Sequence, residues 1–226
     1  MKAKMPQTAP DEVALGQSDG NTDSHPPGKG PSSSMVEAER ILAEPGSQEV
    51  LKVGALLLDD RESAASQAAR VLDEILLRRP EALVPIIERL IVAVGSTQTR
   101  VVNTASSALP VLARVAPARV SRHLDRLVDS FGNTTDIGKD GLVRTFISLC
   151  LASIAYQKRL EPALARALQE ADPKTLAKWT ELVLPALKGE PHAHARTVVE
   201  ERLATLPRPV AQRIAGFLGV KLRPAR

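Results

Sequence analysis

The chain contains an internal repeat. Residues 61–96 read RESAASQAARVLDEILLRRPEALVPIIERLIVAVGS, and residues 98–133 read QTRVVNTASSALPVLARVAPARVSRHLDRLVDSFGN. At a shift of 37 positions, apolar residues align with apolar residues, Pro80 aligns with Pro117, and Gly95 with Gly132. The aligned apolar pairs are Ala68 and Ala105, Leu72 and Leu109, Ile75 and Leu112, Ile87 and Leu124, Leu90 and Leu127, and Val94 and Phe131. A period of this length is typical of an array built from copies of one small structural unit.

The spacing of apolar residues identifies that unit as a pair of helices. Residues 62–79 and 82–94 each carry an apolar stripe at helical spacing, separated by Pro80 and ended by Gly95. The first stripe is Ala65, Ala68, Ala69, Leu72, Ile75 and Leu76; the second is Leu83, Ile86 or Ile87, Leu90, Ile91 and Val94. A lone helical hairpin cannot cover both of its faces, so we expect the copies to stack and share one core.

The rest of the chain extends this pattern with less regular copies. Short helices are predicted at 36–43 and 48–58, with Asp59 and Asp60 as candidate N-caps of the next helix. A third hairpin is predicted at a longer step of 41 to 42 residues, with the extra residues in the loop GNTTDIGKDG, 132–141. This register pairs Val143 with Val102, Leu151 with Leu109, and Ile154 with Leu112. A fourth helical segment aligns poorly, and a short amphipathic helix with a basic tail ends the chain.

Composition supports a helical protein with a separate N-terminal segment. Aromatic residues make up only 2% of the chain, so the core must consist of Leu, Val, Ile and Ala. Residues 1–33 are rich in Pro, Gly, Ser and Asp and have no apolar periodicity, which predicts a disordered tail. The domain prediction is therefore a tail at 1–33 and a helical repeat domain at 34–226.

The repeats resemble a known superfamily. The segments VVNTASSALPVLARVAP (101–117) and LVRTFISLCLASIA (142–155) are similar to the second-helix pattern of HEAT repeats and the related armadillo repeats. Arg144 occupies a place where that pattern often has arginine, and Asn103 occupies the same place one copy earlier. The resemblance covers residues 35–207. It implies an all-α, right-handed α-solenoid of about four hairpins, in a class whose members usually act as scaffolds for other macromolecules.

Targeting and redox features favour a cytoplasmic protein. The first residues lack the apolar stretch of a signal peptide, and the longest apolar run, LVPIIERLIVAV, is interrupted by Glu88 and Arg89. The single cysteine, Cys150, cannot form an internal disulfide and is expected to be a buried thiol. We therefore expect a cytoplasmic protein that does not associate with membranes.

No motif for catalysis or for a cofactor stands out. The loop 132–141 departs from a phosphate-binding loop in its glycine spacing and has Asp140 where a hydroxyl is needed. His192 and His194 lie two residues apart, a spacing that points them to different sides of a helix. The sole tryptophan, Trp179, is interpreted as core filler between repeats rather than as an exposed anchor. The prediction is a protein that is not an enzyme and has no cofactor or metal.

Charge is distributed unevenly and suggests where a partner binds. Residues 34–96 carry 7 basic and 11 acidic groups, a net charge of −4, whereas residues 97–226 carry 20 and 11, a net charge of +9. The candidate partner-binding residues are Arg114, Arg119, Arg122, Arg126, Arg144, Lys158, Arg159 and Arg166. Acidic residues interleave with them at Asp125, Asp129 and Glu161.

The leading functional hypothesis is a scaffold or adaptor that binds a protein partner, with an acidic segment, on the concave face of the solenoid. The alternative is a nucleic-acid-binding module that uses the same basic residues, although the chain has few aromatic side chains for base stacking. An enzyme accessory, or self-association through an apolar end of the stack, is also open.

Overall fold

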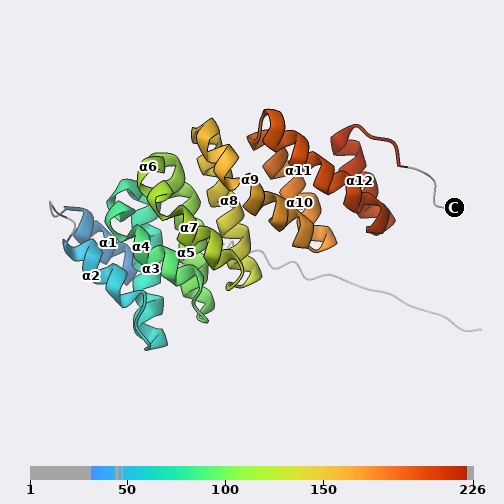
Figure 1. The fold of residues 1–226 in the computed structure, drawn as a ribbon. Coiled ribbons are helices and arrows are strands. Elements are labelled where there is room, and N and C mark those ends of the chain that lie inside the picture. The colour runs from blue at the N-terminus through green and yellow to red at the C-terminus, as the bar shows by residue number, and fades with distance from the viewer. Residues whose placement is uncertain (1–31, 44–45, 47, 223–226) are drawn as a thin grey trace, which may run out of the picture. The chain divides into compact units, whose positions relative to one another are not determined.

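The computed structural model describes residues 32–43, 46 and 48–222, and its regular structure within these ranges is helical, without strands. One row of helices consists of the first helix of each copy. Its members are α1 (Ser33–Ala43), α3 (Glu62–Arg78), α5 (Thr99–Val115), α8 (Asp136–Ala152), α10 (Pro173–Val183) and α12 (Arg208–Leu218). Each member packs against the next one in this order (Figure 1).

The second helices of the copies form another row. Its members are α2 (Gln48–Leu56), η1 (Pro80–Ile86) with α4 (Ile87–Val94), α6 (Pro117–Val120) with η2 (Ser121–His123) and α7 (Leu124–Phe131), α9 (Ile154–Glu170), and α11 (Gly189–Arg202). The short helices η3 (Leu184–Ala186) and η4 (Leu203–Thr205) complete the last connections. Here α2 contacts α4, α4 contacts α7, and α9 contacts α11. Each hairpin thus covers part of the next, as a repeat array requires.

The two copies detected in the sequence match down to their backbone angles. Both α3 and α5 are 17 residues long, and both α4 and α7 are 8 residues long. The corner after the first helix has φ −147° and ψ 78° at Arg79, and φ −140° and ψ 56° at Ala116. Every apolar residue paired by the shift of 37 is buried. The repeat unit and its breakers are therefore confirmed.

The predicted register of the third copy is wrong. The first helices α3, α5, α8 and α10 begin at residues 62, 99, 136 and 173, so the step stays at 37. Leu151 and Ile154, which the longer step assigned to the core, are 67% and 64% exposed. Phe146 and Leu149 occupy the core places of Leu109 and Leu112, and both are fully buried.

The error arises from two glycines that lie inside a helix. The segment DIGKDG forms the first turns of α8 instead of a loop, and Thr135 caps it by accepting a hydrogen bond from the Gly138 amide at 3.3 Å. At Gly141, an added Cβ would lie 2.5 Å from Cβ of Ser106 and 2.6 Å from its Cα. The glycine is needed because α8 approaches the backbone of α5 closely at this point.

The N-terminal predictions need two corrections. The first helix begins at Ser33, three residues before the predicted start, while the tail predicted at 1–33 lies outside the described residues except for its last two positions. The N-cap of α3 is Arg61, whose side chain makes no capping bond, so neither Asp59 nor Asp60 is the N-cap. Asp59 instead accepts a hydrogen bond from the Arg61 amide at 2.9 Å.

Leu, Ile, Val and Ala dominate the core, as the composition predicted. Trp179 is buried, which confirms its interpretation as core filler, and its ring lies 6.2 Å from that of Phe131. Cys150 is also buried, as expected, and burial raises the pKa of its thiol to about 12. Among the described residues, no helix is long and apolar enough to cross a membrane.

Candidate functional site

Four arginines in the second copy lack partners. Arg114 lies in the last turn of α5, Arg119 in α6, Arg122 in η2 and Arg126 in α7, and all four are exposed. Within the described part of the chain, none of them makes an ion pair, hydrogen bond or ring contact. They are also all of the basic residues, apart from His123, between Arg100 and Lys139. Their charge is therefore available to a ligand.

Two of these arginines line a hollow between the first and second copies. The hollow has a volume of about 500 Å³. Its lining residues are Val84, Pro85, Ile87, Glu88, Arg119, Arg122 and His123. Apolar side chains from η1 and α4 face a basic edge from α6 and η2, and Glu88 contributes one carboxylate. This composition suits a ligand that combines apolar and negatively charged groups.

A second hollow continues along the same helix boundary. It has a volume of about 280 Å³ and is lined by residues from the C-terminal ends of α4 and α7. Those residues are Ile91, Val92, Gly95, Arg126, Asp129, Ser130 and Asn133. Arg122 and Arg126 are four positions apart, a spacing that places side chains on one helical face. We call the two hollows together the α4–α7 groove.

Two of the acidic residues interleaved with the arginines pair with the following copy, whereas Asp129 lines the second hollow together with Arg126. Asp125 lies 3.5 Å from Arg159 of α9. Glu161 of α9 contacts His194 of α11 in the same way. Glu88 is the equivalent acid of the first copy, and it lies 3.9 Å from His123. These contacts form a ladder of acid–base pairs along the second helices, and they leave Arg119 and Arg122 unneutralised.

The eight candidate residues do not share one environment. Arg144 pairs with Asp140, Arg159 pairs with Asp125, and Arg166 lies 3.9 Å from Glu170. Lys158 is exposed and, like the four arginines, has no partner in the described part. The structure thus separates five unpaired cations from three that are already engaged. The sequence alone offered no signal for this division, because it depends on contacts between copies.

A further hollow was not predicted from the sequence. It has a volume of about 580 Å³ and lies where α8, α9 and α10 meet beside Phe131. At its side, Asp140 accepts hydrogen bonds from Lys178 at 2.6 Å and from Trp179 Nε1 at 3.0 Å, and it also pairs with Arg144. Burial by itself would raise the pKa of Asp140, but these hydrogen bonds and nearby positive charges lower it below its ordinary value. The charge of Asp140 is therefore neutralised by its neighbours.

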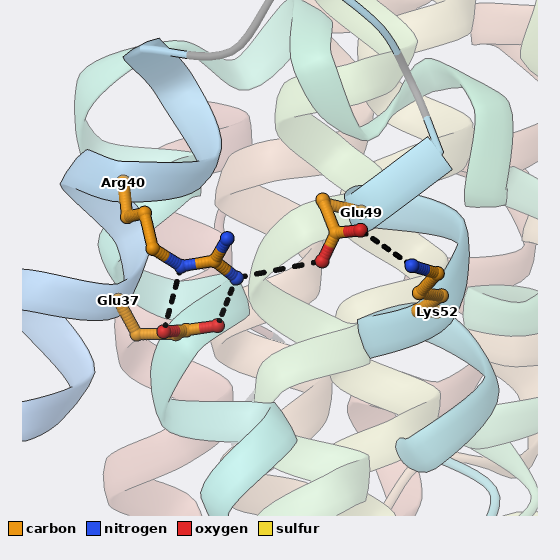
Figure 2. Close-up of polar contacts among 4 residues, drawn as sticks. All are labelled: Glu37, Arg40, Glu49 and Lys52. Carbon is orange, nitrogen blue, oxygen red and sulfur yellow. Dashed lines mark hydrogen bonds and ion pairs between the residues drawn. The ribbon is translucent and has the colours of Figure 1, made fainter.

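A cluster of charged side chains also lies between α1 and α2. Arg40 donates to Glu37 at 2.8 Å and to Glu49 at 3.4 Å, and Lys52 donates to Glu49 at 2.6 Å (Figure 2). The hydrogen bond from Arg40 lowers the pKa of Glu37, and that from Lys52 lowers the pKa of Glu49. The contact of Arg40 with Glu49 joins α1 to α2.

Candidate metal ligands and nucleophiles within the described part of the chain are its His, Cys, Asp and Glu residues. No group of three His, Cys, Asp or Glu residues there could hold a metal ion. His192 and His194 lie on α11, and His194 contacts Glu161. The thiol of Cys150 is buried and its pKa is raised, the opposite of what an activated nucleophile requires.

Comparison with known proteins gives a fold likeness. No family model matches the chain, and no curated protein matches it. A similar solved structure is the crystal structure of an engineered protein from the Northeast Structural Genomics Consortium, with a TM-score of 0.56 and 18% sequence identity. The match covers 82% of this chain and 84% of that chain. At this identity the likeness concerns the fold alone.

Proposed function

We propose that the protein is a non-enzymatic scaffold or adaptor that binds an acidic segment of a protein partner in the α4–α7 groove. In this proposal the helical hairpins form a right-handed α-solenoid of the HEAT-like kind, and the row that contains α4 and α7 lines its concave face. The segments that resemble HEAT second helices, 101–117 and 142–155, lie instead mainly on α5 and α8. The support for the array is the constant step of 37 residues from α3 through α5 and α8 to α10, and the contact of each first helix with the next.

The observation that carries the proposal is the set of unpaired arginines. Most other arginines of the described part engage a carboxylate, a carbonyl oxygen or a ring, as Arg40, Arg78 and Arg202 illustrate. Arg119, Arg122 and Arg126 instead lie along one groove with no such partner. Arginine pairs with carboxylates in a two-bonded geometry that lysine cannot match, so an acidic protein segment suits these side chains.

The mechanism is surface presentation. An extended or helical acidic segment would lie along the groove, with carboxylates meeting Arg119, Arg122 and Arg126 and apolar side chains meeting Val84 and Ile87. Because the arginines are exposed, salt would screen these contacts, and binding should weaken as ionic strength rises. The cytoplasmic location belongs to the same proposal.

A direct test uses a fluorescein-labelled 12-residue peptide of Glu and Gly, read by fluorescence anisotropy at ~50 and ~200 mM NaCl. We expect binding at low salt that weakens at the higher concentration. The double variant Arg119→Glu/Arg122→Glu should weaken binding about 10-fold or more, because two attractive contacts become repulsive. Arg70→Glu is the matched control, since Arg70 is exposed and without a partner on α3, and it should bind as the parent does.

A parallel titration separates the alternative class of partner. Duplex DNA of ~20 base pairs, in a gel shift at the same two salt concentrations, tests nucleic-acid binding through the same arginines. Retardation of DNA without binding of the acidic peptide would replace the scaffold proposal by the nucleic-acid one. Equal loss of peptide binding in the Arg70→Glu control would show that only net charge matters and would contradict a site in the groove.

A further inference from the structure

Large apolar side chains are exposed at two corners where a first helix ends. Leu151 ends α8, Ile154 begins α9, and Val115, the last residue of α5, is 41% exposed. Leu109 and Leu112, one to two turns earlier on α5, are fully buried, so the exposure begins where the helix leaves the core. These corners are therefore apolar without contributing to the interior.

The fold brings the two corners side by side. Helices α5 and α8 have equal length, start 37 residues apart and pack against each other, with Gly141 against Ser106. Their last turns consequently end at the same edge. Two contacts fix this arrangement: α6 packs against α8, and the Tyr156 hydroxyl lies 3.0 Å from Ser121 Oγ. Figure 1 shows α6 and the start of α9 on the same upper side of the helices.

The charged residues that adjoin these corners in the sequence are basic. No acidic residue occurs between Glu88 and Asp125, or between Asp140 and Glu161. The charged neighbours of the apolar residues are basic: Arg114 precedes Val115, and Lys158 lies one helical turn after Ile154. Both cations lack a partner in the described part of the chain. An exposed apolar patch whose nearest charged neighbours in the sequence are basic is complementary to a segment that is apolar and acidic.

We propose that Val115, Leu151 and Ile154, with Arg114 and Lys158, form a docking surface for an apolar–acidic segment of the partner. We call this set the corner surface. The inference rests on the proposed function and deepens it: the acidic partner carries aliphatic side chains beside its carboxylates. The aliphatic groups cover Leu151 and Ile154, and the carboxylates meet Arg114 and Lys158. The segment then continues past Arg119 toward the α4–α7 groove.

The test compares two labelled peptides of equal length and charge, one of Glu and Gly and the other with Leu in place of alternate Gly. We expect the parent protein to bind the Leu-containing peptide at least ~10-fold more tightly, because burial of apolar surface adds to the ionic contacts. The variant Leu151→Gln/Ile154→Gln should lose this preference and still bind the Glu–Gly peptide as the parent does. Both side chains are exposed, so the fold should tolerate the change, and thermal unfolding checks this.

The matched control is Leu77→Gln. Leu77 occupies on α3 the place that Leu151 occupies on α8, and it is 80% exposed. Its corner differs because Glu81 follows it and because the neighbouring Arg78 already pairs with Glu74. The preference for the Leu-containing peptide should survive this substitution. A uniform loss in both variants would contradict a specific surface.

The remaining outcomes separate the two proposals. If the Glu–Gly peptide binds and Leu adds nothing, the corner surface is wrong and the acidic-partner proposal stands. If neither peptide binds, both proposals fail. Sedimentation velocity adds a last discriminator: a dimer that the Leu151→Gln/Ile154→Gln variant abolishes would assign the corner surface to a second copy of the chain and overturn the inference.

Discussion

The two rows of helices differ in how successive copies contact one another. In the first-helix row, α8 approaches α5 so closely that Gly141 has no room for a side chain, and Asp140 joins α8 to α10 through Lys178 and Trp179. In the second-helix row, α4 and α7 leave two hollows between them, and exposed acid–base pairs span the copies.

This difference indicates that the two rows of helices have different roles. The close packing of α8 against α5 makes this part of the first-helix row a main source of the free energy that holds the second and third copies together. The second-helix row keeps unpaired arginines and open space, which stabilise nothing in the free protein. The same sequence period therefore builds a rigid side and a side that can accept a ligand. Substitutions on the two sides should differ accordingly in their effect on unfolding.

The largest effect is expected at Gly141. The Gly141→Ala variant should lower the free energy of unfolding by about 2–3 kcal/mol, because the new methyl group would overlap Ser106 and force α8 away from α5. The matched change is Gly216→Ala in α12, where nothing lies within 4 Å of the added Cβ. Gly216→Ala should be neutral or stabilise by up to about 1 kcal/mol through helix propensity. Urea unfolding of both variants measures the contrast, and equal effects would refute the close approach.

The next effect concerns Asp140. The Asp140→Asn variant should lose about 1–2 kcal/mol near neutral pH, because the charge that Lys178 and Arg144 contact is removed. The pKa of Asp140 is lowered in the folded state, so its contribution is present above the ordinary value of 3.8 and is lost as pH falls through the folded pKa. The parent and the variant should therefore converge in stability near pH ~2. A difference that persists there would show that the hydrogen-bonded shape matters and the charge does not.

Much of the fold follows from the sequence because the copies that carry it are regular. Leu72 and Leu109, or Leu90 and Leu127, recur at one period, and the physical need to bury them fixes both the helices and their partners. The breakers Pro80 and Pro117 then define the corner between helices. No knowledge of contacts between copies was required for these elements.

The third copy shows where that reasoning fails. Gly138 and Gly141 were interpreted as loop residues because glycine destabilises helix interiors. In the structure Gly141 serves a tertiary contact, since only glycine lets α8 approach α5, and this gain outweighs the propensity; Gly138 lies against Thr134, just before the helix. The displaced register then placed Leu151 in the core, although it is exposed. A constant period of 37, applied through the whole chain, would have avoided the error.

The candidate site was only half predictable for a similar reason. The sequence identified the basic residues, but it could not tell Arg122, which is free, from Arg159, which pairs with Asp125 of the preceding copy. Whether a charge is neutralised depends on side-chain directions across copies. The acid–base ladder, for example, connects Glu161 to a histidine 33 positions away. Spacing within a single helix does not contain this information.

A smaller effect is expected at the ladder itself. Glu161→Gln should lower the free energy of unfolding by about 0.5 kcal/mol or less, because the pair with His194 lies at the surface and salt screens it. Urea unfolding at low and moderate salt, with Glu190→Gln on the exposed start of α11 as the control, measures this loss. If the free energy of unfolding fell as much as in Asp140→Asn, the second-helix row would also hold the copies together. That result would contradict the different roles inferred for the two rows.

The smallest effect on stability, and the largest separation between stability and binding, is expected at Arg122. Arg122→Glu removes no contact of the folded protein, so the free energy of unfolding should change by less than about 0.5 kcal/mol. The new carboxylate would also lie beside Arg119 and Arg126 and relieve repulsion among like charges, which makes a slight gain as reasonable as a slight loss. Binding of the Glu–Gly peptide should nevertheless fall, because the new charge repels it. A fall of about 2 kcal/mol or more in the free energy of unfolding would show that Arg122 has a structural partner. Its charge would then not be available to a ligand.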